Sequence, residues 1–200
     1  MVLSNSQSLV SYFADIGLAI NTVEQNSIEE VIKCIVSATI SQHRIWIIGN
    51  GGSAATASHF AADLTRQTNQ TKIKVRAICL SESTASITAI GNDYTFDDIF
   101  ARQIWSLADK EDVIISLSAS GNSPNLVESI RRAKAMGLRT ISFVGFQGGV
   151  LKAESELVLH FPTTVGAYEI AEDTHSIVCH YIAMQVRRRI EDYANSTNFS

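Results

Sequence analysis

The sequence predicts an α/β protein built on a parallel sheet, and two observations carry this prediction. Short, continuous apolar runs, bounded by turn residues, recur along the chain and are typical of strands buried on both faces. Between these runs, apolar residues recur at three- and four-residue steps, which is the period of an amphipathic helix. Because predicted strands alternate with predicted helices, we expect neighbouring strands to run parallel.

The elements are expected in the following order. Two leading helices are predicted between about Ser8 and Gln42, on the helical spacing of the apolar residues there. Strands buried on both faces are predicted at 44–49, 75–79, 113–117, 140–144 and 157–161. Helices are predicted at 54–67, 84–90, 96–108, 125–135 and 170–193. Pro124 is placed to open a helix and Pro162 to end a strand.

Length and composition favour one domain. Two hundred residues with 46% apolar content can form a full core, and no linker, repeat or low-complexity segment divides the chain. We expect a single domain over 1–195, with leading helices in 1–42 and the α/β core and last helix in 43–195. The remaining 196–200 form a tail, and the polar stretch from Asn195 is expected to be disordered.

Charge and cysteine usage exclude several classes of protein. The formal net charge is −4 without a run of lysines or arginines, so we expect no nucleic-acid partner. Cys34, Cys79 and Cys179 lie far apart in apolar stretches and are expected to be buried free thiols. The first residues lack a secretory signal, and no apolar run reaches the ~20 residues that span a bilayer. A cytoplasmic protein with no membrane partner is expected.

Two glycine- and serine-rich loops follow predicted strands and precede predicted helices. They are Gly49-Asn50-Gly51-Gly52-Ser53 and Ser118-Ala119-Ser120-Gly121-Asn122-Ser123. In such a turn, backbone N–H groups and the positive helix end face an anion at the carboxyl edge of the sheet. Ordinary turns also use glycine and serine, but two such loops in one sheet favour a phosphate ligand. Neither loop is a Walker A or GxGxxG sequence, so no nucleotide cofactor is expected.

The motifs together resemble those of a known family. The chain is similar to the sugar isomerase (SIS) domain, and within that group to the phosphoheptose isomerases. Four segments carry the resemblance, namely Gly49 to Ala55, His59-Phe60-Ala61, Gly91-Asn92-Asp93 and Ser118 to Asn125. The resemblance implies a three-layer sandwich with a five-stranded parallel sheet, two leading helices and a long C-terminal helix. It also implies a homotetramer with active sites at subunit interfaces. The implied activity is an aldose-ketose isomerase that converts sedoheptulose 7-phosphate into D-glycero-D-manno-heptose 7-phosphate for lipopolysaccharide or capsule heptose biosynthesis.

The resemblance also implies the residues that bind the substrate. Ser53, Ser118, Ser120 and Ser123 would hold the phosphate, and Asn50, Asn92 and Asp93 would line the sugar. The full set of implied substrate-binding residues is Asn50, Gly51, Gly52, Ser53, Asn92, Asp93, Ser118, Ala119, Ser120, Ser123 and Glu172. Ala119 departs from the family, which typically has a threonine there, so one hydroxyl is lost.

Four polar residues on two predicted helices are candidates for acid–base chemistry and metal binding. His59 and Asp63 are four apart and share one helix face, whereas Glu172 and His180 belong to the last helix. Taken alone, Glu172 fits a first-turn acid and His180 an interface histidine. The resemblance implies that all four, His59, Asp63, Glu172 and His180, would bind one Zn²⁺, and that Asp63, Glu172 and His180 would be catalytic.

Two of these positions differ from the family. Asp63 is one methylene shorter than the family's glutamate, and Glu172 replaces a glutamine. The two changes are hypothesised to compensate each other, which leaves open whether Asp63 or Glu172 is the base. Glu172 and His180 would lie about 12 Å apart along a continuous helix. Both can therefore serve one site only if the helix is interrupted or if they come from different subunits.

Two other functions remain open from the sequence. The chain could isomerise a different phosphosugar, because Asp63, Ala119 and Glu172 are expected to surround the reacting end. It could also be a non-catalytic phosphosugar-binding protein, like the tetrameric relative that binds the replication initiator DnaA. Retention of His59, His180 and the carboxylates argues against that second alternative.

Overall fold

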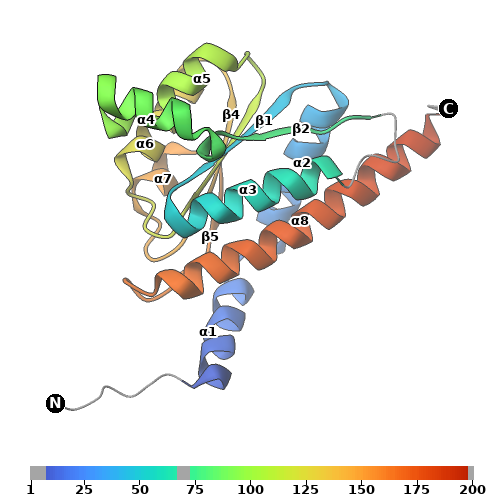
Figure 1. The fold of residues 1–200 in the computed structure, drawn as a ribbon. Helices are drawn as coiled ribbons and strands as arrows, with labels where there is room; N and C mark the ends of the chain where they lie inside the picture. The colour runs from blue at the N-terminus through green and yellow to red at the C-terminus, as the bar shows by residue number, and fades with distance from the viewer. Residues whose placement is uncertain (1–7, 67–72, 198–200) are drawn as a thin grey trace.

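The computed structural model describes residues 8–66 and 73–197 of the chain and contains a five-stranded parallel sheet (Figure 1). The strand order is β2-β1-β3-β4-β5, and each neighbouring pair is parallel. The strands are β1 (Arg44–Gly49), β2 (Arg76–Cys79), β3 (Val113–Ser118), β4 (Arg139–Val144) and β5 (Leu157–His160). The predicted α/β class and parallel sheet are confirmed.

The strand order places a topological switch point between β1 and β3. The chain leaves β1 toward β2 on one side and leaves β3 toward β4 on the other. Connections that diverge in this way open a crevice outside the carboxyl ends of the two strands, where α/β proteins bind their ligands. The two glycine- and serine-rich loops follow β1 and β3, so both border this crevice.

Helices cover both faces of the sheet and complete a three-layer sandwich (Figure 1). One face packs against α2 (Gln25–Ile40), α3 (Gly51–Arg66) and α8 (Tyr168–Ser196). The other packs against α5 (Ala101–Leu107), α6 (Pro124–Ala135) and α7 (Gly149–Glu154), with α4 (Thr84–Asp93) beside them. Two 3-10 turns, η1 (Leu80–Glu82) and η2 (Phe96–Asp98), complete this side.

Alternation along the central strands explains the two cores. Ile45 and Ile47 of β1 pack in the cluster with α2, α3 and α8, whereas Trp46 and Ile48 pack in the opposite cluster. Successive side chains of a strand point to opposite faces, so a continuous apolar run supplies both cores at once. All six residues of β3 are buried, as expected for a central strand.

The edge strands correct one prediction. β2 and β5 were predicted to be buried on both faces, but Arg76 of β2 is exposed, Ile78 is 40% exposed and Leu157 of β5 is only half-buried. Both strands lie at the edges of the sheet, where one side has no neighbouring strand and the helical layers end. Apolar composition alone does not distinguish an edge strand from a central one.

Several helix boundaries also differ from the predictions. The segment predicted as one helix over 96–108 divides into η2 and α5, and α7 was not predicted. Residues 195 and 196, predicted to be disordered, form the last turn of α8. The end of the predicted tail at 198–200, like the predicted helix end at Gln67, lies outside the described residues.

The first helix, α1 (Leu9–Asn21), projects from the sandwich and contacts the beginning of α8 (Figure 1). There the Tyr12 hydroxyl donates a 2.7 Å hydrogen bond to Asp173 Oδ2. The two leading helices and the long last helix are therefore confirmed. Cys79 and Cys179 are buried free thiols as predicted, whereas the free thiol of Cys34 is only partly buried. No helix among the described residues is long and apolar enough to cross a bilayer.

Candidate active site

A pocket opens at the carboxyl edge of the sheet, between the loops that follow β1 and β3. Its volume is about 100 Å³, small beside the ~300–1,000 Å³ of pockets that enclose drug-sized ligands. The pocket can therefore hold a small chemical group rather than a whole ligand of that size. It is lined by Asn50, Ser53, Leu117, Ser118, Ala119, Ser120, Ser123, Leu126, Tyr168 and Glu172. All four serines predicted to hold a phosphate are among these residues.

The second loop folds around its own hydroxyls. Ser118 Oγ accepts a 3.0 Å hydrogen bond from the Gly121 N–H, and Ser120 Oγ accepts one of 3.2 Å from the Asn122 N–H. Gly121 has a φ of +67°, and a Cβ there would lie 2.0 Å from the Gly148 carbonyl oxygen, so only glycine fits. The turn leads into α6, which begins at Pro124 directly after Ser123. The N-terminus of a 12-residue helix therefore lies beside the pocket.

The first loop is held in place by a residue of the next strand connection. Ser81 Oγ donates a 2.8 Å hydrogen bond to the Gly49 carbonyl oxygen and accepts one of 3.2 Å from the Gly49 N–H. A Cβ on Gly49 would approach the Ser53 carbonyl oxygen to 2.5 Å, so α3 can start this close to β1 only because residue 49 is glycine. These contacts fix Ser53, which is 5% exposed, in the first turn of α3.

Glu172 approaches the same turn of α3 from the last helix. A Cβ on Gly52 would lie 2.1 Å from Glu172 Oε2, so glycine at position 52 makes room for this carboxylate. Burial raises the pKa of Glu172 above its usual value, and the nearby Ser53 N–H partly opposes that rise. The structure therefore places Glu172 against the first glycine- and serine-rich loop.

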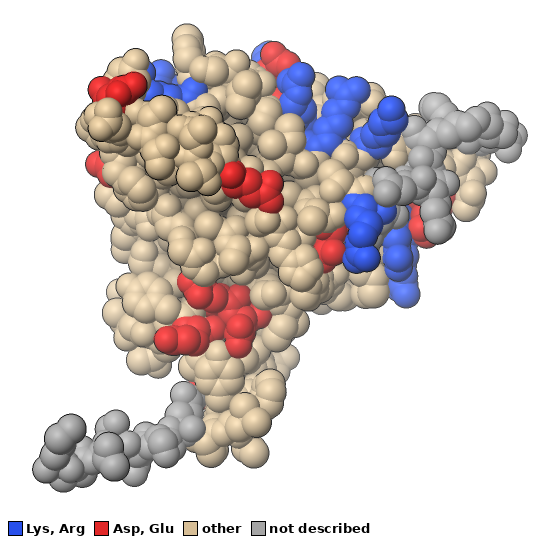
Figure 2. Space-filling model, viewed as in Figure 1, with Lys and Arg blue, Asp and Glu red and all other residues tan. Residues whose placement is uncertain are grey.

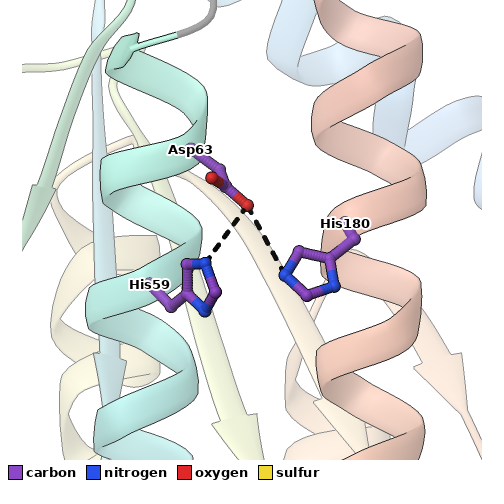
Figure 3. A group of neighbouring side chains, drawn as sticks. All are labelled: His59, Asp63 and His180. Atoms are coloured by element: carbon purple, nitrogen blue, oxygen red, sulfur yellow. Dashed lines mark ion pairs between the residues drawn. The ribbon is translucent and has the colours of Figure 1, made fainter.

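Three of the four candidate metal ligands come together beside α3 and α8. Figure 3 shows His59 and Asp63 on α3 and His180 on α8 with their side chains turned toward one another. Asp63 Oδ2 lies 3.6 Å from His59 Nε2 and 3.6 Å from His180 Nε2, and the two imidazole centroids are 4.9 Å apart. The Asp63 side chain is 8% exposed, whereas those of His59 and His180 are 60% and 52% exposed. The buried carboxylate of Asp63 thus lies beside two imidazole rings that are accessible to solvent.

The spacing of these three groups suits a divalent cation. Their ligand atoms all lie within 4.8 Å of one another. Zinc ligands at about 2.1 Å in tetrahedral geometry are about 3.4 Å apart, close to the two observed 3.6 Å separations. Two imidazoles and one carboxylate are a ligand set that zinc enzymes use, with the fourth position left for a substrate. His59, Asp63 and His180 therefore form a possible metal-binding group.

The remaining candidate residues lie apart from this group within the chain. Glu172 is not a member of it, because α8 runs without interruption from Tyr168 to Ser196. An interrupted helix is therefore excluded as the way for Glu172 and His180 to reach one ion. Asn92 and Asp93 end α4, where Asn92 Nδ2 donates a 2.9 Å hydrogen bond to Asp93 Oδ1, and they do not line the pocket.

Three residues of the site were not singled out from the sequence. Tyr168 lines the pocket and packs edge-on against Phe146, with ring centroids 5.0 Å apart. Ser81 clamps the first loop, and Asn125 pairs with Asn50 across the two loops. Ser81 comes two residues after the end of β2, so its position at the carboxyl edge of the sheet was an available signal.

Charge is unevenly distributed on the face drawn in Figure 2. Acidic side chains gather where α8 begins, next to α1, and basic side chains lie toward the opposite end of this face. The acids at the beginning of α8 include Glu169, Glu172 and Asp173. The hydrogen bond to Asp173, burial and the charges of these three acids together raise the pKa of Tyr12 to about 12. No Lys or Arg lines the pocket among the described residues. A phosphate would therefore be held by backbone N–H groups and hydroxyls.

The fold and this pocket define a sugar-phosphate domain of the SIS type, and the model of the SIS domain family matches residues 10–145. A protein of Thermoplasma acidophilum named as a probable phosphoheptose isomerase is 41% identical over 76% of this chain and 82% of its own length. A solved phosphoheptose isomerase of Francisella tularensis superposes with a TM-score of 0.83 at 25% identity, over 90% of this chain and 96% of that one. The solved phosphoheptose isomerase of Neisseria gonorrhoeae superposes with a TM-score of 0.81 at 28% identity, over 89% of this chain and 96% of that one. The chain belongs to the phosphoheptose isomerase family.

Proposed function

We propose that this protein is an aldose-ketose isomerase that converts sedoheptulose 7-phosphate into D-glycero-D-manno-heptose 7-phosphate. The observation that carries the proposal is that one chain presents both a serine-lined pocket and the trio His59, Asp63 and His180, on the scaffold of this family. The pocket offers hydroxyls and helix N-termini to a phosphate. The trio offers groups that can accept and donate protons.

Phosphate binding is assigned to the two loops. The hydroxyls of Ser53, Ser118, Ser120 and Ser123 and the backbone of Ala119, all in the pocket lining, would hold the phosphate. Gly51 and Gly52 do not line the pocket themselves, but they would contribute backbone N–H groups from the first turn of α3. The methyl group of Ala119 offers no hydrogen bond, so the remaining serines and the backbone bind the anion without it. Asn50 would then face the sugar from the first loop. Asn92 and Asp93 would reach a sugar only across a subunit interface, since they do not line the pocket of their own chain.

Isomerisation requires two proton transfers. A base removes the proton from the carbon next to the carbonyl while an acid protonates the carbonyl oxygen, which gives an enediol, and the reverse steps at the neighbouring carbon give the product. Asp63 is suited to act as the base, because it is a carboxylate fixed between two imidazoles. His180 is suited to deliver the proton to oxygen, because its ring is accessible and lies next to Asp63.

A divalent cation such as Zn²⁺ would be held by His59, Asp63 and His180, and when bound it would polarise the sugar carbonyl in place of proton donation by His180, whose ring nitrogen would then be a ligand. Glu172 would add a fourth ligand only from another subunit, since the unbroken α8 keeps it from the trio of its own chain. We therefore also propose a homotetramer with active sites at its interfaces. The chain would form one domain and act in the cytoplasm, in the synthesis of heptose for lipopolysaccharide or capsule.

The proposal is tested by an isomerase assay with sedoheptulose 7-phosphate, with and without a chelator. We expect turnover that falls at least tenfold after chelation and returns when Zn²⁺ is added, because the trio would lose its ion. If the protein turns over only a different phosphosugar, the proposed substrate is wrong and the proposed type of reaction stands. Failure with every phosphosugar, together with capture of an initiator protein, would instead favour the non-catalytic alternative.

Replacing Glu172 separates its two possible roles. We expect Glu172→Gln to lower the KM for the sugar phosphate about threefold, because the substitution removes a partly buried negative charge from the phosphate pocket. The kcat should change less than KM, since the trio is untouched. Steady-state kinetics provide the measurement. A loss of kcat as large as that of an Asp63 variant would show that Glu172 is the base, as the compensation hypothesis requires.

A further inference from the structure

Asn125 is a buried amide next to the phosphate pocket. It is 1% exposed and occupies the second position of α6, directly after Pro124. Its backbone carbonyl accepts a 2.6 Å hydrogen bond from Ser129 Oγ, one turn further along the helix. The ring of Pro124 and the hydrogen bond from Ser129 both restrict the first turn of α6. The direction of the Asn125 side chain is therefore determined by a rigid element.

The Asn125 amide makes a reciprocal pair with Asn50. Asn50 Nδ2 donates a 2.9 Å hydrogen bond to Asn125 Oδ1, and Asn125 Nδ2 donates one of 2.9 Å to Asn50 Oδ1. Two simultaneous hydrogen bonds between planar amides fix their relative orientation as well as their distance. Since Asn50 belongs to the loop after β1 and Asn125 follows the loop after β3, the pair bridges the switch point of the sheet.

We infer that Asn125 is a positioning residue of this site, because its amide holds Asn50 and thereby fixes the two phosphate loops relative to each other. Asn50 lines the pocket and Asn125 does not. The pair uses one N–H and one oxygen lone pair of Asn50, so a second N–H remains for a ligand, aimed by Asn125. The inference depends on the proposed function only for the identity of the sugar, since it requires no more than that the two loops bind a phosphate group.

Calorimetric titration of the full chain with inorganic phosphate, and separately with sedoheptulose 7-phosphate, tests this inference. For Asn125→Ala we expect the Kd of both ligands to rise about tenfold, which corresponds to the coupling typical of groups in one hydrogen-bonded network. Asn50→Ala should have an effect at least as large, because it also removes the N–H that faces the ligand. The double variant should bind no more weakly than Asn50→Ala alone, because that substitution already breaks the pair.

Gln103→Ala is the matched control for a general loss of stability. Gln103 is also a buried amide, 6% exposed, and its Nε2 donates a 2.8 Å hydrogen bond to the Ile99 carbonyl within the α5 region, outside the phosphate pocket. The Tm of Gln103→Ala should fall about as much as the Tm of Asn125→Ala. The Kd of Gln103→Ala for phosphate should stay unchanged.

Three results would overturn the inference. They are a Kd of Asn125→Ala within twofold of the unmodified protein, fully additive effects in the double variant, and an unmodified protein that binds no phosphate. Phosphate binding that responds to Asn125→Ala, in a protein that turns over no sugar phosphate, would contradict the proposed function and leave the inference supported.

Discussion

Replacing Asp63 by asparagine is expected to lower the kcat for sugar-phosphate isomerisation by roughly 100- to 10,000-fold, the range over which a positioned acid or base contributes. The amide keeps the shape of the side chain but cannot accept the substrate proton. It also removes the charge that lies 3.6 Å from each of His59 and His180. Because Asp63 does not line the serine-lined pocket proposed to bind the phosphate, the KM should change much less than kcat.

Asp63→Glu is the informative companion to this variant. It keeps a carboxylate, on the longer side chain that the resemblance to the family implies for this position, so it should retain far more activity than Asp63→Asn. Thermal unfolding of both variants serves as the control, because Asp63 also lies 3.3 Å from Arg66 Nη2 and a buried charge supports its partners. An Asp63→Asn protein that is folded and retains the kcat of the unmodified protein would exclude Asp63 as the base and leave Glu172 as the candidate.

The central part of the fold could be predicted from the sequence because burial on both faces leaves a strong signal. The run at 113–117 has no polar residue except Ser116, and in the structure it lies at the middle of the sheet. The edge strand at 75–79 was predicted in the same way from its apolar residues, although Arg76 interrupts the run, and in the structure it has no strand beyond it. Likewise, α7 is only six residues long, too short to show a helical period.

The site divides in the same way between local and long-range features. The serines of both loops were predictable because each sits at the end of a strand with a helix after it. The pairing of His59 and Asp63 was predictable from their four-residue spacing. What no local pattern contains is the approach of α8 to α3, which brings His180 to the trio and Glu172 to Gly52. These contacts depend on how two helices distant in sequence pack together.

Helix α8 therefore supports two parts of the site while it also forms part of the core. Its Glu172 lines the pocket with the two glycine- and serine-rich loops, and its His180 faces Asp63 about two turns further along. Between them, His175 points into the core, where it is 1% exposed. Its ring packs edge-on against Phe143 and Phe161, with centroid distances of 6.4 and 5.4 Å. A buried histidine thus anchors α8 to the core between the two site residues.

His175 is uncharged in the folded protein. Neither ring nitrogen has a hydrogen-bond partner within the described part of the chain. Burial lowers the pKa of His175 from 6.5 to about 4, and the backbone of Val144 lies near enough to oppose this only weakly. At a pH between these two pKa values, His175 binds a proton in the unfolded chain but not in the folded one. The stability contributed by the neutral ring is therefore complete above pH 6.5 and is lost as the pH falls toward 4.

Acid should consequently unfold the protein through this residue before most carboxylates titrate. From pH 7.5 to pH 5 we expect the free energy of unfolding to fall by about 2 kcal/mol through His175 alone, at 1.36 kcal/mol for each unit between the two pKa values. Urea unfolding at a series of pH values measures this slope. His175→Leu, which is apolar and of similar volume, should flatten it, and an equally steep slope in that variant would contradict the assignment. Because α8 carries both Glu172 and His180, the unmodified protein should lose phosphate binding and isomerase activity together as this helix loosens.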